Sequence, residues 1–175
     1  MSTENFNMNS KLEGIALDAL DLILLNRLQE DASESNQALA KRVHISPPTC
    51  LRRVKRLRDA GLIERQIAIL DPDRMATHLG HGLTAIVEIT LDRQDQGAVE
   101  AFEACVAPDA AVQQCYRVSP GPDFILVVHA ADMPAYLALA QRLFTSDANV
   151  RNVKGFFSIK RAKFEPKLPL VRRKN

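Results

Sequence analysis

The sequence has little cysteine, no tryptophan and no long apolar run. Its three cysteines, Cys50, Cys105 and Cys115, are odd in number and lack the spacing of a metal site, which favours a reducing compartment over a disulfide framework. No apolar run approaches the roughly 18 residues that cross a bilayer, and the polar segment 1–10 does not resemble a signal peptide. These absences predict a cytoplasmic protein that makes no use of a membrane.

An excess of charge of one sign is also lacking, because the net charge of the 175 residues is only +2. With 46% apolar and 25% charged residues, the composition suits one globular domain or two small ones. The basic residues are concentrated locally: Lys41 to Arg65 holds eight lysines and arginines against only Asp59 and Glu64. Such a cluster is typical of a nucleic-acid-binding surface.

The segment 35–64, SNQALAKRVHISPPTCLRRVKRLRDAGLIE, predicts two short helices around a tight turn. His44-Ile45 is placed to make the turn, Ser46 to cap the second helix, and Pro47 to occupy its first position. Gly61 then ends the helix, as glycine commonly does after the last helical residue. This pattern indicates a helix-turn-helix that reads DNA.

The second helix of this segment has two distinct faces. Cys50, Val54 and Leu57 recur at helical spacing and predict the face that packs on the core. The arginine-rich face lies about 120° away, at 100° per residue, and guanidinium groups match both phosphate and guanine edges. The candidate DNA-contacting residues are Ser46, Pro48, Thr49, Arg52, Arg53 and Arg56. The alternative, a solvated face with ordinary salt bridges, fits less well because so few acidic residues accompany the basic ones.

Flanking segments complete this unit. Residues 17–31 predict a further helix, with Asp18 as its N-cap and Asp21 three residues later. The β-branched run 63–70 predicts a strand that leaves the three-helix core, and Asp71-Pro72-Asp73 predicts a turn.

From Gly82 onward the periodicity predicts a second, α+β unit. Strands are expected at 83–91, 112–118, 124–129 and 150–163, and helices at 94–106 and 132–144. The order βαββαβ is that of the ferredoxin-like fold, a four-stranded antiparallel sheet with both helices on one face. The other face of such a sheet needs a cover, and we expect a second subunit there.

The order and spacing of five stretches resemble the Lrp/AsnC, or feast/famine, transcriptional regulators from about Leu17 to Phe164. The stretches are LDALDLILLNRLQED, ALAKRVHISPPTCLRRVKRLRDAGLIE, ILDP, VEITL and VSPGPDFILVVHAADMPAY. The resemblance implies a winged helix-turn-helix that binds double-stranded DNA, followed by a ferredoxin-like domain that binds an amino acid. It also implies homodimers that assemble further into tetramers or octamers, with an effector pocket between dimers.

The resulting division of the chain has five parts. They are a disordered tail at 1–16, a winged helix-turn-helix at 17–64, a linker strand and turn at 65–82, a ferredoxin-like effector-binding and oligomerisation domain at 83–164, and a basic tail at 165–175. In that last part we expect Arg172, Arg173 and Lys174 to add nonspecific attraction to DNA.

The resemblance also implies where an effector binds. The family pattern Gly-x-x-Asp appears as Pro120-Gly121-Pro122-Asp123, which keeps the acid and displaces the glycine by one position. The implied contacts are Gly121, Asp123, Met133, Phe156, Phe157 and Ser158. Asp123 would fix the ammonium group of an apolar amino acid such as leucine or methionine, and Arg117 would either pair with Asp123 or hold the carboxylate. An ordinary turn role for Asp123, and core or interface packing for the three apolar residues, are the alternatives.

Proteins with two other functions have the same two-domain architecture. The siroheme decarboxylases resemble these regulators, but they carry a His-x-Tyr-Asn-x-Trp-like segment where this chain has SPGPDFIL, and an arginine-rich helix has no purpose in such an enzyme. An architectural DNA-binding protein without an effector is the second alternative. His78 and His81 lack a third ligand, so we expect no metal site there. For a regulator of this kind we also expect no other cofactor and no enzymatic activity.

Overall fold

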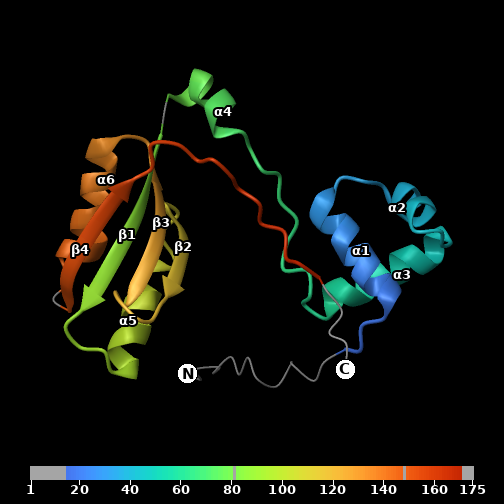
Figure 1. Cartoon of the computed structure of the whole chain (residues 1–175), viewed down its shortest axis with the longest axis horizontal. Coiled ribbons are helices and arrows are strands. Elements are labelled where there is room, and N and C mark those ends of the chain that lie inside the picture. Colours follow the sequence, from blue (N-terminus) through green and yellow to red (C-terminus); the bar gives the residue numbers. More distant parts are fainter. Residues whose placement is uncertain (1–14, 81, 148, 171–175) are drawn as a thin grey trace, which may run out of the picture. The chain divides into compact units, whose positions relative to one another are not determined.

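The computed structural model describes residues 15–80, 82–147 and 149–170, which divide between two compact units (Figure 1). The first unit runs to Ala68 and resumes at Glu165, and the second is Ile69–Phe164. The N-terminal residues 1–14, and with them most of the expected tail, lie outside the described residues.

Three helices build the described part of the first unit: α1 (Ala19–Glu30), α2 (Asn36–Arg42) and α3 (Pro47–Asp59). Asp18, Ser35 and Ser46 cap their N-termini, and Asp18 and Asp21 form the reciprocal capping box expected of α1. The helices pack around one apolar cluster, in which the most enclosed residues are Leu24, Leu25, Leu39, Ala40, Cys50 and Leu57. The predicted three-helix core is therefore confirmed.

The turn between α2 and α3 has an unusual backbone at His44, whose φ is 57°. A non-glycine residue in this left-handed region costs roughly 1–2 kcal/mol. At the other end of α3, Gly61 has a φ of 72° and ends the helix, as predicted. The turn thus fixes where α3 begins, and the glycine fixes where it ends.

The connection to the second unit differs from the prediction. Residues 64–71 pair with no strand, and Ile67, Ile69 and Leu70 are exposed. A β-branched run forms a strand only where another strand pairs with it, and none of the described segments does so here. Asp71-Pro72 begins a helix, α4 (Pro72–Leu79), and Asp71 accepts a hydrogen bond from the Arg74 amide. The predicted turn is wrong because aspartate followed by proline is equally a helix start.

The rest of the second unit has the ferredoxin-like fold. Its elements are β1 (Leu83–Leu91), α5 (Gln96–Val106), β2 (Val112–Arg117), β3 (Phe124–Ala130), α6 (Met133–Ala140) and β4 (Val150–Phe157). The antiparallel strands are ordered β2-β3-β1-β4. Alternate residues of β1 and β3 pack with both helices in one cluster that includes Phe102, Phe124 and Phe144. The α+β fold class is confirmed.

One strand ends earlier than predicted, and one helix changes type before its predicted end. β4 stops at Phe157 because β1, its only neighbour, begins at Leu83 and offers no partner beyond the bond from the Ser158 amide to the Thr84 carbonyl. The helix predicted at 132–144 is present, but its α-helical part, α6, ends at Ala140 and a π-helical turn, Gln141–Thr145, completes it.

The second face of the sheet carries apolar side chains that neither α5 nor α6 covers. Ile86 lies opposite Val127 of β3 and Phe156 of β4, so three strands contribute to one apolar row. Ile86 and Phe156 are 44% and 52% exposed. Such a row on a bare sheet face marks a surface for association.

The chain returns to the first unit at its C-terminal end. The Gln29 side chain accepts from the Leu168 amide at 2.7 Å and donates to the Leu168 carbonyl at 3.2 Å. Lys167 pairs with Glu30, and Leu170 packs against the apolar cluster of the three helices. Residues 165–170 are therefore part of the first unit rather than a free tail, while Arg172, Arg173 and Lys174 lie outside the described residues.

Candidate DNA-binding surface and effector site

Helix α3 presents its two predicted faces as expected. Cys50 and Leu57 are fully buried, and Val54 packs partly against them. The side chain of Arg52 is exposed and makes no ion pair with any residue that the structure describes. Ser46 and Thr49 lie at the start of α3, where their hydroxyl oxygens are 2.8 Å apart, and Pro48 is exposed beside them. The structure therefore leaves an open polar surface at the N-terminal half of α3.

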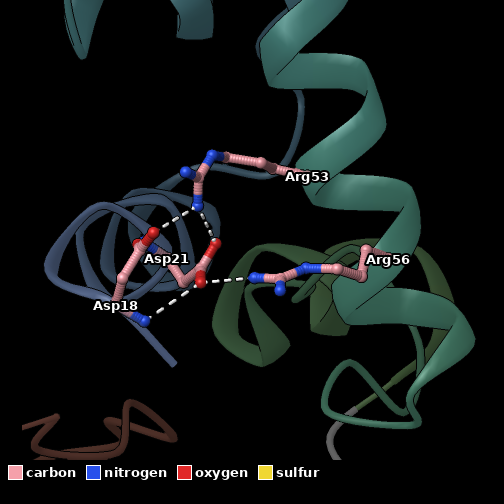
Figure 2. Close-up of polar contacts among 4 residues, drawn as sticks. All are labelled: Asp18, Asp21, Arg53 and Arg56. Atoms are coloured by element: carbon pink, nitrogen blue, oxygen red, sulfur yellow. Dashed lines mark hydrogen bonds and ion pairs between the residues drawn. The ribbon is translucent and has the colours of Figure 1, made fainter. Parts of the chain in front are cut away.

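Arg53 and Arg56 do not extend freely into solvent. Figure 2 shows both reaching from α3 to the start of α1, where Arg53 Nη1 lies 2.7 Å from Asp18 Oδ2 and 2.8 Å from Asp21 Oδ1. Arg56 Nη2 pairs with the other oxygen of Asp21. The Asp21 side chain is fully buried, whereas that of Asp18 is 53% exposed. One enclosed carboxylate thus holds two arginines of the predicted DNA-contacting face.

These contacts lower the pKa of both acids. Burial opposes ionisation of Asp21, but the Asp18 amide and the two guanidinium groups stabilise its carboxylate more strongly, so its pKa lies below the usual range. The Asp21 amide and Arg53 likewise lower the pKa of Asp18. Both groups are therefore anionic at neutral pH and balance part of the positive charge of α3.

Sequence reasoning assigned Asp18 and Asp21 only to the cap of α1. Their pairing with α3 joins residues that lie 32 to 35 positions apart in the chain. The available signal was the shortage of acidic residues near the arginines, which left their partners to come from elsewhere. A small open cavity of about 130 Å³ lies among Asp18, Arg52, Arg53 and Arg56.

At the predicted effector loop, Asp123 already has a structural partner. Its Oδ2 accepts a hydrogen bond from the Leu91 amide at 2.7 Å, where β1 ends. Gly121 has a φ of 119°, which glycine adopts without steric cost, so the displaced glycine fits the turn of this loop. No ion pair joins Arg117 to Asp123 in the part of the chain that the structure describes. One carboxylate oxygen of Asp123 remains for a ligand.

The remaining predicted effector residues lie at the opposite end of the sheet. Asp123 precedes β3 and Met133 follows it, so the length of β3 separates them by roughly 20 Å at 3.4 Å per residue. Phe156 is on the bare face, whereas Phe157 is on the helix face and stacks edge-on with Tyr136, ring centroids 5.0 Å apart. Ser158 is exposed beyond β4. One copy of this unit therefore does not bring the six residues together.

Within residues 15–80, 82–147 and 149–170, no three histidine, cysteine or acidic side chains lie close enough to hold a metal ion. His81, considered above with His78, lies outside these ranges. None of the described helices is long and apolar enough to cross a membrane.

The two units match known domain families. Residues 17–64 match a winged helix-turn-helix DNA-binding domain, and residues 84–168 match the Lrp/AsnC ligand-binding domain. The fold and the exposed arginine of α3 thus define a sequence-specific DNA-binding transcriptional regulator with a ligand-binding domain.

Similar proteins agree with these matches. The leucine-responsive regulatory protein of Salmonella typhimurium is 40% identical over 131 residues, 75% of this chain and 77% of that protein. An uncharacterised helix-turn-helix regulator of Haemophilus influenzae is 36% identical over 81% of this chain and 82% of its own length. A transcriptional regulator of Neisseria meningitidis, solved with L-methionine, superposes with a TM-score of 0.77 at 32% identity, covering 88% of this chain and 97% of that one. The chain belongs to the Lrp/AsnC family.

Proposed function

We propose that this regulator binds double-stranded DNA as a homodimer or a higher assembly, through the N-terminal half of α3, and that a small apolar amino acid modulates the binding. The observation that carries the proposal is the exposed polar face of α3 in a family regulator, with Arg52 free of any ion pair to the described residues. The proposed contacts are Ser46, Pro48, Thr49, Arg52, Arg53 and Arg56. Asp21 leaves the remaining donors of Arg53 and Arg56 in fixed positions, which suits contacts with DNA phosphates.

The Arg52→Ala variant is expected to weaken binding to a genomic target by about 5- to 150-fold, the range of about 1–3 kcal/mol for an arginine that reads a base. The target is first identified by genome-wide mapping of bound DNA, and affinity is then measured by fluorescence anisotropy against salt. Arg58→Ala is the matched control, because Arg58 is on the opposite side of α3 and donates to Gln66. An equal loss in both variants, or no loss in Arg52→Ala, would contradict the assignment.

The effector site is proposed to combine two chains. Gly121 and Asp123 are at one end of the sheet, and Met133, Phe156, Phe157 and Ser158 are at the other. The gap of roughly 20 Å far exceeds the length of one amino acid. Two copies placed end to end would put the acidic loop of one beside the apolar end of the other, which supports a pocket between subunits.

Leucine or methionine is the proposed effector, because the apolar residues would enclose the side chain while Asp123 meets the ammonium. The relatives named above include a leucine-responsive protein and a regulator solved with L-methionine. We also infer that the chain acts in the cytoplasm and catalyses no reaction, since the relatives named above are transcriptional regulators.

Calorimetry should show that Asp123→Asn binds the effector at least about tenfold more weakly than the wild-type protein, because a hydrogen bond to a charged group contributes about 1.5–3 kcal/mol. Asparagine keeps an oxygen for the Leu91 amide, so the loop is retained. The control is Asp95→Asn at the N-cap of α5. All twenty amino acids are titrated; equal binding by Asp123→Asn would show that Asp123 is only a turn residue, and no binding by the wild type would show an effector-independent regulator.

A further inference from the structure

The cavity among Asp18, Arg52, Arg53 and Arg56 holds three positive side chains and one negative one. The two acids that meet the arginines differ in accessibility, since Asp21 is enclosed and Asp18 faces solvent. Arg53 is bound to both, while Arg56 contacts only Asp21. Asp18 can therefore leave this cluster without releasing either arginine from α1.

We propose that the cavity is a binding site for a DNA phosphate, and that the Asp18 carboxylate occupies the guanidinium group of Arg53 until DNA displaces it. This inference rests on the proposed DNA-binding role of α3. Carboxylate and phosphate present oxygen acceptors that a guanidinium group binds in the same way, so the two compete for one donor. Asp21, 2.8 Å from Arg53 Nη1, keeps the arginine in position during the exchange.

The cluster also has more donors than acceptors. Arg53 Nε is enclosed and has no hydrogen-bond partner, and Arg52 lines the cavity without an ion pair, among the residues that the structure describes. A phosphate oxygen in the open cavity would accept from the accessible guanidinium donors that line it, Arg52 among them, whereas the enclosed Nε of Arg53 stays out of its reach. Asp18, with 53% of its side chain exposed, is the group that can turn into solvent to admit it.

An internal carboxylate at this site reduces the affinity for every DNA sequence. Nonspecific affinity comes from phosphates neutralised by the protein and from the counterions that they release. When DNA binds, the ion pair between Asp18 and Arg53 must break. The new contact between Arg53 and a phosphate therefore contributes less net binding free energy. Asp18 therefore lowers the affinity of the protein for nonspecific genomic DNA.

The test is Asp18→Ser, which retains an N-cap acceptor for the Asp21 amide but removes the charge. It is expected to bind both a random duplex and a genomic target more tightly than the wild-type protein. Because no carboxylate then offsets the charge of the bound phosphate site, the salt dependence should become steeper by up to about 0.9, so affinity should change up to about 3.5-fold more between 50 and 200 mM salt. Asp95→Ser, which alters the N-cap of α5 by the same substitution, is the matched control for net charge.

The outcomes separate this inference from the proposed function. A wild-type protein that retains no DNA would refute the DNA-binding role of α3 itself. If the wild type binds and Asp18→Ser has the same affinity and salt dependence as Asp95→Ser, the competition by Asp18 is refuted. Asp18→Asn is melted and titrated in parallel; loss of helix in both Asp18 variants would show that the carboxylate serves the fold, which also refutes the inference.

Discussion

The Asp21→Ala variant should lose about 3 kcal/mol of the stability of the DNA-binding unit. Removing one partner of a buried ion pair costs about 3–5 kcal/mol, and the lower value applies because Arg56 can turn into solvent. The substitution also removes the acceptor for the Asp18 amide. For a unit of this size, the midpoint of thermal unfolding should fall by about 12 to 24 °C.

The sequence provides a direct way to measure this. Its only tyrosines, Tyr116 and Tyr136, are in the ferredoxin-like unit and it has no tryptophan, so tyrosine fluorescence follows that unit while far-ultraviolet circular dichroism follows both. We expect an early loss of helix with an unchanged tyrosine transition. Asp18→Ser, which loses only the exposed partner of Arg53, is the control and should change the midpoint far less.

Acid provides a second check on Asp21. Its folded pKa is lowered, so its stabilising contribution is complete above the unfolded pKa, about 3.9, and is lost as pH falls through the folded value. The stability difference between the wild type and Asp21→Asn should therefore shrink below pH 4. A difference that stays constant into acid would mean that the charge of Asp21 contributes nothing.

If the protein assembles through its bare sheet face as proposed, the Ile86→Lys variant should be a monomer and should bind the genomic target about a thousandfold or more weakly. Ile86 lies in the apolar row with Val127 and Phe156, and a charge buried in a sheet-to-sheet interface has no partner. Without a second subunit only one half-site is bound, and specific sites are typically bound about 10³- to 10⁷-fold more tightly than nonspecific DNA. Sedimentation velocity at micromolar concentration and anisotropy on the genomic target measure the two effects.

Leu79→Lys is the matched control, because Leu79 is 79% exposed on α4, in the same unit but away from the sheet. It should leave both assembly and affinity unchanged. Assembly that survives Ile86→Lys would mean that the row does not form the interface. A wild-type protein that sediments as a monomer would refute the dimer altogether.

Local signals made the first unit predictable. The N-cap serines, Pro47 and Gly61 fixed the ends of the helices, and apolar spacing fixed the buried face of α3. The partners of Arg53 and Arg56 were not predictable in the same way. Their acids belong to another helix, and helical periodicity says which face is polar but not which distant charge meets it.

The difference found between the two units has an equally specific cause. The run 63–70 has the composition of a strand, but strand formation depends on a neighbour that the composition does not reveal. Phe156 and Phe157 are consecutive in a strand and therefore point to opposite faces, so their joint role in an effector site stays a prediction that one copy of the sheet does not test. The sheet order, by contrast, followed from the βαββαβ succession because few topologies satisfy it.

Because Glu165–Leu170 docks against α1, the ligand-binding unit, Ile69–Phe164 (the sensor), is an insertion within the DNA-binding unit (the reader). Two peptide connections instead of one join the two units. After a single proteolytic cut near Leu70, the two fragments are still held together by the docked C-terminal segment. They separate only when the hydrogen bonds between Leu168 and Gln29 also break. For the same reason, an affinity tag added at the carboxyl end would be carried by the reader. Fluorescent labels intended to report on the sensor belong within Ile69–Phe164.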